Sequence, residues 1–252
     1  MPNVSVIIPT FNRAHLIEES VSSVLAQTLK PTEVIVVDDG SNDKTWDILK
    51  NLGFSLSGSQ ENTLRYLYKE NGGVSSARNV GIELSSSEYV ALLDSDDQWK
   101  PTKLEAQLSS LERENFSCRV SHTDEIWIRN GIRVNQHKKH SKAGGDLFEK
   151  CLKMCCISPS SALIHRSVFD DLGSFDENLK ACEDYDFWLR YCAFEKTHFL
   201  NEPLTIKNGG HSDQLSQAYW GMDRFRIYSL EKLLQNRKLT RSKYQLLSLI
   251  HI

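Results

Sequence analysis

The chain has 252 residues, 25% of them charged and 40% hydrophobic, an ordinary composition for a globular protein of one large or two small domains. Its formal net charge of −3 offers no basic surface for nucleic acid, so we expect no nucleic-acid partner. No apolar run approaches the ~20 residues that span a bilayer, so we expect no transmembrane segment. The first residues run directly into a predicted strand and leave no room for a signal peptide, which favours a cytoplasmic protein.

The six cysteines contain no Cys-x-x-Cys pair, and in a chain without an export signal we expect free thiols. Cys151 and Cys155 would share one face of a helix, so a zinc site with His137 or His140 is one interpretation. Buried core thiols are the other interpretation, and the one that we favour.

Strands and helices alternate in the first half of the chain, which predicts a parallel, doubly wound sheet with right-handed crossovers. We expect Pro9 to stop the first strand, and Ser41 or Asn42 to cap the second helix. The stretch 53–63 is rich in Ser, Gly and Asn and is predicted to be a surface loop. The strands are expected at 4–8, 33–39, 64–68 and 89–93, and the helices at 17–25, 41–52 and 74–84.

The second half has a different pattern. Asn130-Gly131 is a typical hairpin turn and lies between two apolar segments, which predicts antiparallel structure over 120–135. The basic stretch 137–145 is expected to be a mobile loop, and the apolar tail 246–252 to pack on the domain or on a partner. Further elements are expected as a helix from about residue 101, a helix at 146–154, a strand at 161–165, and helices at 183–193 and 216–234.

Three carboxylates follow the predicted buried strand 89–93. Asp94, Asp96 and Asp97 should therefore emerge at the carboxyl end of that strand, where open α/β sheets bind ligands. Like charges at this spacing raise one another's pKa unless a cation or hydrogen-bond donors hold them ionised. An oxygen-only ligand set suits Mg²⁺ or Mn²⁺ completed by substrate phosphates and water. The alternative is an acidic turn in which Asp97 caps the following helix.

Five segments of this sequence, in this order, resemble the signature segments of family 2 glycosyltransferases of the GT-A fold. The resemblance covers roughly residues 3 to 210. It implies an α/β fold with a Rossmann-like, mostly parallel central sheet flanked by helices, and a smaller antiparallel part on the acceptor side. The segments are VIIPTFN (6–12), VVDDGS (36–41), NGGVSSARNVG (71–81), LDSDD (93–97) and CEDYDFWLR (182–190).

The same resemblance implies a division of the chain. A glycosyltransferase domain is expected over 1–215, with a nucleotide-binding half at 1–97 and an acceptor-binding half at 98–215. The remaining residues, 216–252, would form a C-terminal helical extension. This extension is amphipathic, so a homodimer or a peripheral contact with the inner face of a membrane is open.

The resemblance also implies the reaction, which is inverting transfer of a sugar from a nucleotide diphosphate with the help of Mn²⁺ or Mg²⁺. A UDP-sugar would be the donor, and a saccharide or lipid-linked saccharide of a cell-envelope polysaccharide would be the acceptor. Asp96 would hold the metal, with Asp97 as the alternative ligand, and Phe11 would stack on the base while Asp39 accepts from a uracil-like ring. The donor-binding residues implied are Pro9, Thr10, Phe11, Asn12, Asp39, Arg78, Asp94 and Ser95.

The resemblance assigns the catalytic base to Asp184, at the start of a predicted helix. A helix amino terminus favours the carboxylate by ~0.3–1 kcal/mol, and the alternative is that Glu183 and Asp184 only cap this helix. His211 lies in a glycine-rich turn and is either a third metal ligand or a structural residue. In isolation, we would favour Phe11 as a core residue and Arg78 as a surface ion pair, and a functional role for the aspartates.

Two rival functions remain open at this point. A nucleotidyltransferase would share the nucleotide-binding half, but it usually carries a glycine-rich basic loop near its amino end, and residues 9–16 contain no glycine. A non-catalytic nucleotide-sugar-binding module of the same fold is the second rival. The intact aspartates argue against it, although intact residues do not prove turnover.

Overall fold

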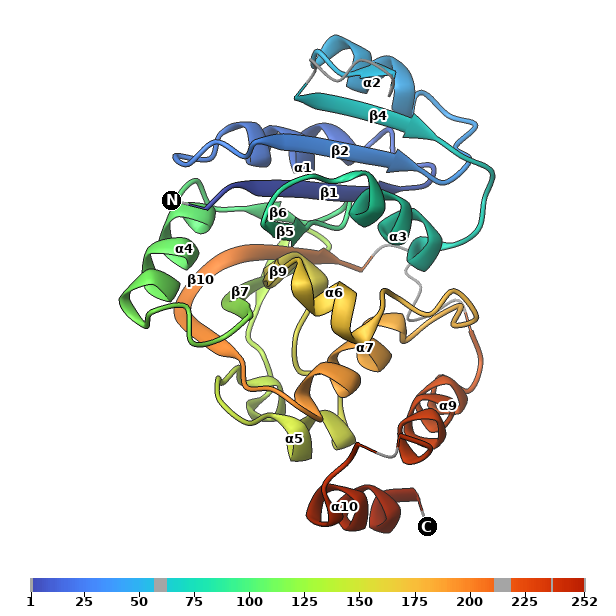
Figure 1. Cartoon of the computed structure of the whole chain (residues 1–252). Helices are drawn as coiled ribbons and strands as arrows, with labels where there is room; N and C mark the ends of the chain where they lie inside the picture. The colour runs from blue at the N-terminus through green and yellow to red at the C-terminus, as the bar shows by residue number, and fades with distance from the viewer. Residues whose placement is uncertain (1, 57–62, 211–218, 237, 252) are drawn as a thin grey trace.

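The computed structural model describes residues 2–56, 63–210, 219–236 and 238–251 (Figure 1). The strands are β1 (Val4–Thr10), β2 (Glu33–Asp38), β3 (Ser55–Leu56), β4 (Leu64–Tyr68), β5 (Tyr89–Leu92), β6 (Gln98–Trp99), β7 (Val120–Arg129), β8 (Ile132–Val134), β9 (Ala162–His165) and β10 (His198–Gly209). The α-helices are α1 (Ile17–Leu25), α2 (Thr45–Asn51), α3 (Val74–Leu84), α4 (Lys103–Arg113), α5 (Phe148–Lys153), α6 (Ser167–Leu172), α7 (Glu183–Cys192), α9 (Asp223–Leu234) and α10 (Arg241–His251). The described strands form one sheet in the order β3-β4-β2-β1-β5-β9-β7-β10-β6, with β8 paired to β7.

The first half of the sheet is parallel, as the sequence predicts. β1 lies between β2 and β5 and runs parallel to both, and β2 runs parallel to β4. Residues of β1 alternate between the two faces, so Val6 and Ile8 pack in the cluster that contains α1 and α4 while Ile7 faces α3. The carboxyl ends of these strands therefore meet at one edge of the sheet.

The second half is mixed rather than simply antiparallel. β9 runs antiparallel to both β5 and β7, and the predicted hairpin is confirmed, with Trp127 opposite Val134. Sequence patterning missed the long strand β10, which runs parallel to β7 with register shifts around Pro203. Its interrupted register hides the apolar alternation that identifies a strand.

Some predicted boundaries are wrong for identifiable reasons. Pro9 lies within β1. It is tolerated because the hydrogen bonding between β1 and β5 ends at Ile7, so the missing N–H of Pro9 removes no hydrogen bond between these strands. Neither Ser41 nor Asn42 caps α2, because the helix begins later, and Asp43 Oδ1 accepts from the Thr45 N–H instead.

The basic stretch 137–145 is also more ordered than predicted. It contains a 3₁₀ helix, Lys138–His140, and Gly145 forms an isolated bridge with Thr197. The predicted helix over 216–234 begins at residue 223 among the described residues, and 211–218 lie outside them.

The C-terminal extension packs on the acceptor-side core. Leu230 and Leu233 of α9 and Leu247 of α10 are buried in the same apolar cluster as Phe148 of α5 and Trp188 of α7. In Figure 1, α9 and α10 lie at the bottom of the molecule, beside α5 and α7. Among the described residues, no helix combines the length and the apolar character needed to cross a bilayer.

The cysteines are free thiols, as predicted, and Cys151, Cys156 and Cys192 are buried. Within the ranges that the structure describes, no group of three or more His, Cys, Asp or Glu side chains is arranged to hold a metal. The zinc interpretation of Cys151, Cys155, His137 and His140 is therefore wrong.

The packing of α3 on the sheet depends on Gly81. A Cβ there would lie 2.4 Å from Ile7 Cγ2 and 3.3 Å from Val37 Cγ2. Gly81→Val should therefore lower the free energy of unfolding by about 1–3 kcal/mol through overpacking, measured by urea denaturation. Glu83→Val, on the exposed side of the same helix, should change it by less than about 1 kcal/mol. Equal losses in the two variants would contradict the packing argument.

Candidate active site

Of the three acids after β5, Asp94 is partly exposed whereas Asp97 is buried. The Asp94 side chain is 27% exposed, its N–H donates to Ser160 Oγ (3.1 Å), and its carbonyl accepts from the Asp97 N–H (3.0 Å). Asp97 is buried, and its Oδ1 accepts from the Asn208 N–H on β10 (3.0 Å). The helix-capping alternative for Asp97 is wrong, because α4 begins only at Lys103.

The electrostatics of the acidic turn favour a cation. Burial raises the pKa of Asp96, and the nearby Asp94 carboxylate raises it further. Burial also raises the pKa of Asp97 well above its usual range, against the opposing charge of Lys207. Two carboxylates with substrate phosphates and water are a sufficient site for Mg²⁺ or Mn²⁺, so Asp94 and Asp96 fit such an ion. The third predicted ligand, His211, lies outside the described residues.

Arg78 joins the two halves of the molecule. Its guanidinium is buried and donates to Asp94 Oδ1 (2.7 Å) after β5 and to Glu183 Oε1 (2.6 Å) at the start of α7. Burial would raise the pKa of Asp94, but the charge of Arg78 outweighs it and the pKa is lowered. The surface-ion-pair interpretation of Arg78 is therefore wrong, because this ion pair is internal.

Asp184, the predicted base, is partly exposed in the first turn of α7. Its Oδ1 accepts from the Tyr185 N–H (2.7 Å), and its Oδ2 accepts from the Cys155 thiol (3.3 Å). Burial and the adjacent Asp184 raise the pKa of Cys155 well above its usual range, so this residue stays a thiol and donates. Cys155 is a neighbour that sequence reasoning did not identify.

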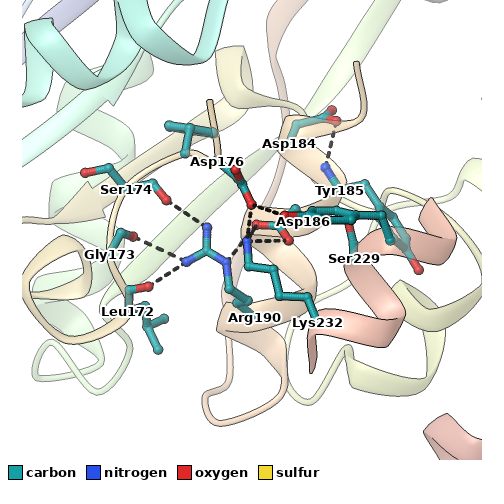
Figure 2. A network of polar contacts seen from close by, with 12 residues as sticks. Leu172, Gly173, Ser174, Asp176, Asp184, Tyr185, Asp186, Arg190, Ser229 and Lys232 are labelled. Atoms are coloured by element: carbon teal, nitrogen blue, oxygen red, sulfur yellow. Dashed lines mark hydrogen bonds and ion pairs between the residues drawn. The ribbon is translucent and has the colours of Figure 1, made fainter. Parts of the chain in front are cut away.

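A second network holds α7 in place (Figure 2). Asp186 accepts from Arg190 (2.8 Å) and from Lys232 of α9 (3.1 and 3.2 Å), and Lys232 also binds Asp176 (2.6 Å). Arg190 in turn donates to the carbonyl groups of the turn 172–174. The C-terminal extension therefore helps to fix the turn that carries Asp184.

The predicted donor-binding residues lie at the carboxyl ends of β1 and β2. The Phe11 side chain is 46% exposed, so its interpretation as a core residue is wrong, whereas Thr10 is buried. Asn12 has a positive φ of 52°, donates its N–H to Ser41 Oγ (2.8 Å) and accepts from the Asn42 N–H (2.9 Å). Pro9 lies within β1 just before them, and Ser95 is buried in the acidic turn.

Asp39 holds the loop that precedes α3. Its Oδ1 accepts from Lys69 Nζ (2.6 Å) and the Gly72 N–H (2.9 Å), and its Oδ2 accepts from the Gly73 N–H (2.7 Å). The loop is thus tied to the end of β2. One lone pair of Oδ2 remains for a further donor.

Sequence reasoning missed two charged residues beside the acids. Lys207 follows Thr205 on one face of β10, the face on which Thr205 Oγ1 meets Thr123 Oγ1 of β7 (3.0 Å). Glu125 lies on the same face of β7, because it follows Thr123 by two residues. Burial would lower the pKa of Lys207, but Asp97, Glu125, Asp94 and Asp184 raise it. No sequence signal identified Lys207, because β10 itself was not predicted.

Comparison with known protein families identifies the family to which this chain belongs. The sequence profile described as Glycosyl transferase family 2 matches residues 5–173. This chain belongs to glycosyl transferase family 2. The predicted family is confirmed, and membership favours it over the nucleotidyltransferase alternative.

Several relatives of this family 2 chain are similar over most of its length. An uncharacterised glycosyltransferase of Rickettsia typhi is 36% identical over 86% of this chain and 67% of its own length. TuaG of Bacillus subtilis, named as a teichuronic acid biosynthesis glycosyltransferase, is 42% identical over 86% of this chain and 84% of its own. WfgD of Escherichia coli, named as a UDP-Glc:α-D-GlcNAc-diphosphoundecaprenol β-1,3-glucosyltransferase, is 34% identical over 74% and 68%. Other relatives are longer, and the chain spans 35% of a Rickettsia felis glycosyltransferase.

The fold of this family 2 chain also matches a solved structure. Staphylococcus aureus TarS (residues 1–349), crystallised with UDP-GlcNAc, superposes with a TM-score of 0.78 over 98% of this chain and 71% of TarS. At 23% sequence identity this similarity concerns the fold alone. The predicted α/β fold of the GT-A class is confirmed.

Removal of Arg78 tests the connection between the two halves. Arg78→Met should lower the free energy of unfolding at pH 7 by about 3–5 kcal/mol, because Asp94 and Glu183 would be left unpaired. Urea denaturation measures this loss. Arg78→Lys keeps the positive charge but lacks the guanidinium fork that pairs with both carboxylates. The decrease in the free energy of unfolding should therefore be smaller than in Arg78→Met. A loss below about 1 kcal/mol in Arg78→Met would contradict a structural role for the ion pair.

Proposed function

We propose that this chain is an inverting glycosyltransferase that moves a sugar from a UDP-sugar to an acceptor hydroxyl, with Asp184 as general base. The observation that carries the proposal is the connection of a partly exposed carboxylate to the donor-side acids. Asp184 follows Glu183, which Arg78 ties to Asp94. Burial would lower the pKa of Lys207, but Asp97, Asp94 and Asp184 raise it, which supports a single site that includes both the base and the acidic turn.

The donor would lie along the carboxyl ends of β1, β2 and β5. The half-exposed ring of Phe11 is available to stack on the nucleobase, beside Pro9, Thr10 and Asn12. Asp39 retains a lone pair on Oδ2 for a ring N–H such as that of uracil. Asp94 and Ser95 would approach the ribose and diphosphate, while Arg78 acts through Asp94. UDP-GlcNAc bound by TarS and UDP-Glc in the name of WfgD support a uridine nucleotide.

Asp94 and Asp96 would hold the Mn²⁺ or Mg²⁺ ion, with Asp97 as the alternative ligand and His211 as a further one. The ion, when bound, supplies charge that stabilises the diphosphate leaving group. The side chains of the protein orient this group. Burial raises the pKa of Asp96, and the Asp94 carboxylate raises it further; a cation would relieve this repulsion between the two carboxylates, which supports the assignment.

Inverting transfer is an in-line displacement at the anomeric carbon. The acceptor oxygen forms the new bond as the bond to the diphosphate breaks, and the acceptor proton passes to a carboxylate oxygen of Asp184. The Tyr185 N–H and the Cys155 thiol each hold one of these oxygens, which fixes the orientation of the carboxylate. A carboxylate held in one orientation supports the assignment of Asp184 as the general base.

The acceptor would be a saccharide of a cell-envelope polysaccharide, free or lipid-linked. The names of TuaG and WfgD, which refer to teichuronic acid and to a diphosphoundecaprenol acceptor, support this class. Transfer would take place on the cytoplasmic side, with α9 and α10 as the surface for a peripheral membrane contact or a homodimer. Exposed side chains on these helices include Ile227, Tyr244 and Leu249.

Asp184→Asn should reduce transfer by at least about 10³-fold, because the amide cannot take the acceptor proton. UDP binding and the free energy of unfolding should stay within error of the wild type, since Asn has the same shape and can still accept from the Tyr185 N–H. Transfer is measured as release of UDP that depends on acceptor, and binding by calorimetry. Full residual transfer would refute the base assignment.

Metal dependence separates the two candidate acids. EDTA should abolish transfer, and Mn²⁺ or Mg²⁺ should restore it. UDP at about 100 times its dissociation constant should add about 2.7 kcal/mol of stability, and more in the presence of the ion. Asp96→Asn should abolish the metal-dependent part of this stabilisation. Asp97→Asn should preserve it, because Asp97 is turned inward to Asn208. The reverse pattern would make Asp97 the ligand.

A further inference from the structure

A cavity of about 410 Å³ lies between the β7–β8 hairpin, the segment 135–142 and the first part of β10. The sequence predicts the hairpin and treats only the stretch 137–145 as a loop, and the function proposed above does not use the cavity. Its lining includes an aromatic ring, Trp127, and more basic than acidic side chains. Glycosyl acceptors must bring a hydroxyl to the base, so the position of this cavity relative to Asp184 matters.

The floor of the cavity is a buried ion pair. Lys142 Nζ lies 3.1 Å from Glu125 Oε1, and both side chains are under one tenth exposed. Glu125 also accepts from the hydroxyl of Ser158 and from Trp127 Nε1 (2.8 Å). Burial would raise the pKa of Glu125, but Lys142, Lys207 and these hydrogen bonds lower it to about 2. The floor therefore stays ionised at neutral pH and presents fixed hydrogen-bonding groups.

This floor is connected to the base. Lys142 Nζ donates to the Cys156 carbonyl (3.1 Å), and the preceding residue, Cys155, donates to Asp184 Oδ2 (3.3 Å). The path from the cavity to the proposed base thus consists of the Lys142–Cys156 contact, the peptide bond between Cys156 and Cys155, and the Cys155–Asp184 contact.

The mouth of the cavity is basic. Arg133 on β8 and Lys138 in the 3₁₀ helix both line it and are exposed. Neither forms an ion pair with any residue that the structure describes. Glu125 is already paired with Lys142, so Asp124 is the one acid of the lining left to balance Arg133 and Lys138. A guanidinium and an ammonium group that line the same cavity suit a phosphate group, whose oxygens accept from both.

We propose that this cavity is the acceptor subsite and that it selects a phosphorylated saccharide, with the sugar on Trp127 and the phosphate between Arg133 and Lys138. The inference rests on the proposed function and names its acceptor class. A neutral saccharide would use the Trp127 and Glu125–Lys142 contacts but not the basic mouth. Phosphorylation should therefore increase affinity without changing donor binding.

The test compares two probes by titration calorimetry in the presence of UDP. One probe is GlcNAc α-linked to a short alkyl diphosphate, and the other is the corresponding uncharged alkyl α-glycoside. The wild type should bind the charged probe at least about tenfold more tightly. The double variant Arg133→Glu/Lys138→Glu should lose this preference and keep its affinity for the neutral glycoside within about twofold.

The matched control is Arg113→Glu/Lys139→Glu, which makes the same change in charge at exposed residues that do not line the cavity. It should keep the wild-type preference. Equal binding of the two probes by the wild type, an equal loss in the control, or weaker binding of the charged probe with UDP present than without it would each overturn the proposal. The last outcome would mean that the cavity binds the donor diphosphate instead.

Failure of the proposed function would look different. Release of UDP from the donor without acceptor, and binding of UDP itself, should be the same in the wild type and in both double variants. A wild type that neither binds UDP nor turns over donor would refute the glycosyltransferase proposal. Calorimetry with the two probes would still decide whether the cavity prefers phosphate.

Discussion

The active-site geometry depends on one buried guanidinium. Arg78 reaches from α3 to Asp94 after β5 and to Glu183 at the start of α7, so a single side chain sets the distance between the acidic turn and the turn that carries Asp184. A buried charge without partners is costly, so this arrangement tolerates little displacement of either half. The planar fork of arginine suits the role, because Nη1 and Nη2 donate from separate atoms in fixed directions, whereas the three N–H groups of lysine share one nitrogen.

The rest of the molecule supports α7 from the other side. Lys232 of α9 joins Asp186 and Asp176, and Arg190 closes the turn 172–174, so the C-terminal helices are continuous with the acceptor-side core (Figure 2). The candidate site thus combines a parallel sheet, which carries Asp94 and Asp96 at its edge, with a helix held by ion pairs, which carries Asp184. Between them, Lys207 on β10 lies among carboxylates from both halves. Its charge balances acids that would otherwise repel one another before any substrate binds.

Much of the donor half follows from local sequence. Apolar runs of four to seven residues, bounded by turns, identify β1, β2, β4 and β5, and their alternation with helices leaves few topologies. The acids at the strand ends were therefore predicted at the correct edge. Boundaries were less predictable where tertiary pairing decided them. Pro9 remains in β1 because the pairing of β1 with β5 ends before it, at Ile7. The local sequence around Pro9 does not predict where that pairing ends.

The sequence by itself determined the family, the parallel half of the sheet and the candidate acids, because these depend on short segments whose order along the chain is enough. Only the tertiary structure decided what surrounds those acids. Lys207 lies near the acids only because β10 pairs with β7, and the contacts of Lys142 with Glu125 and of Cys155 with Asp184 join residues far apart in the sequence. The contacts of Lys207 depend on how β10 is aligned with β7. The apolar pattern of β10 is interrupted, so no short stretch of its sequence predicts that alignment.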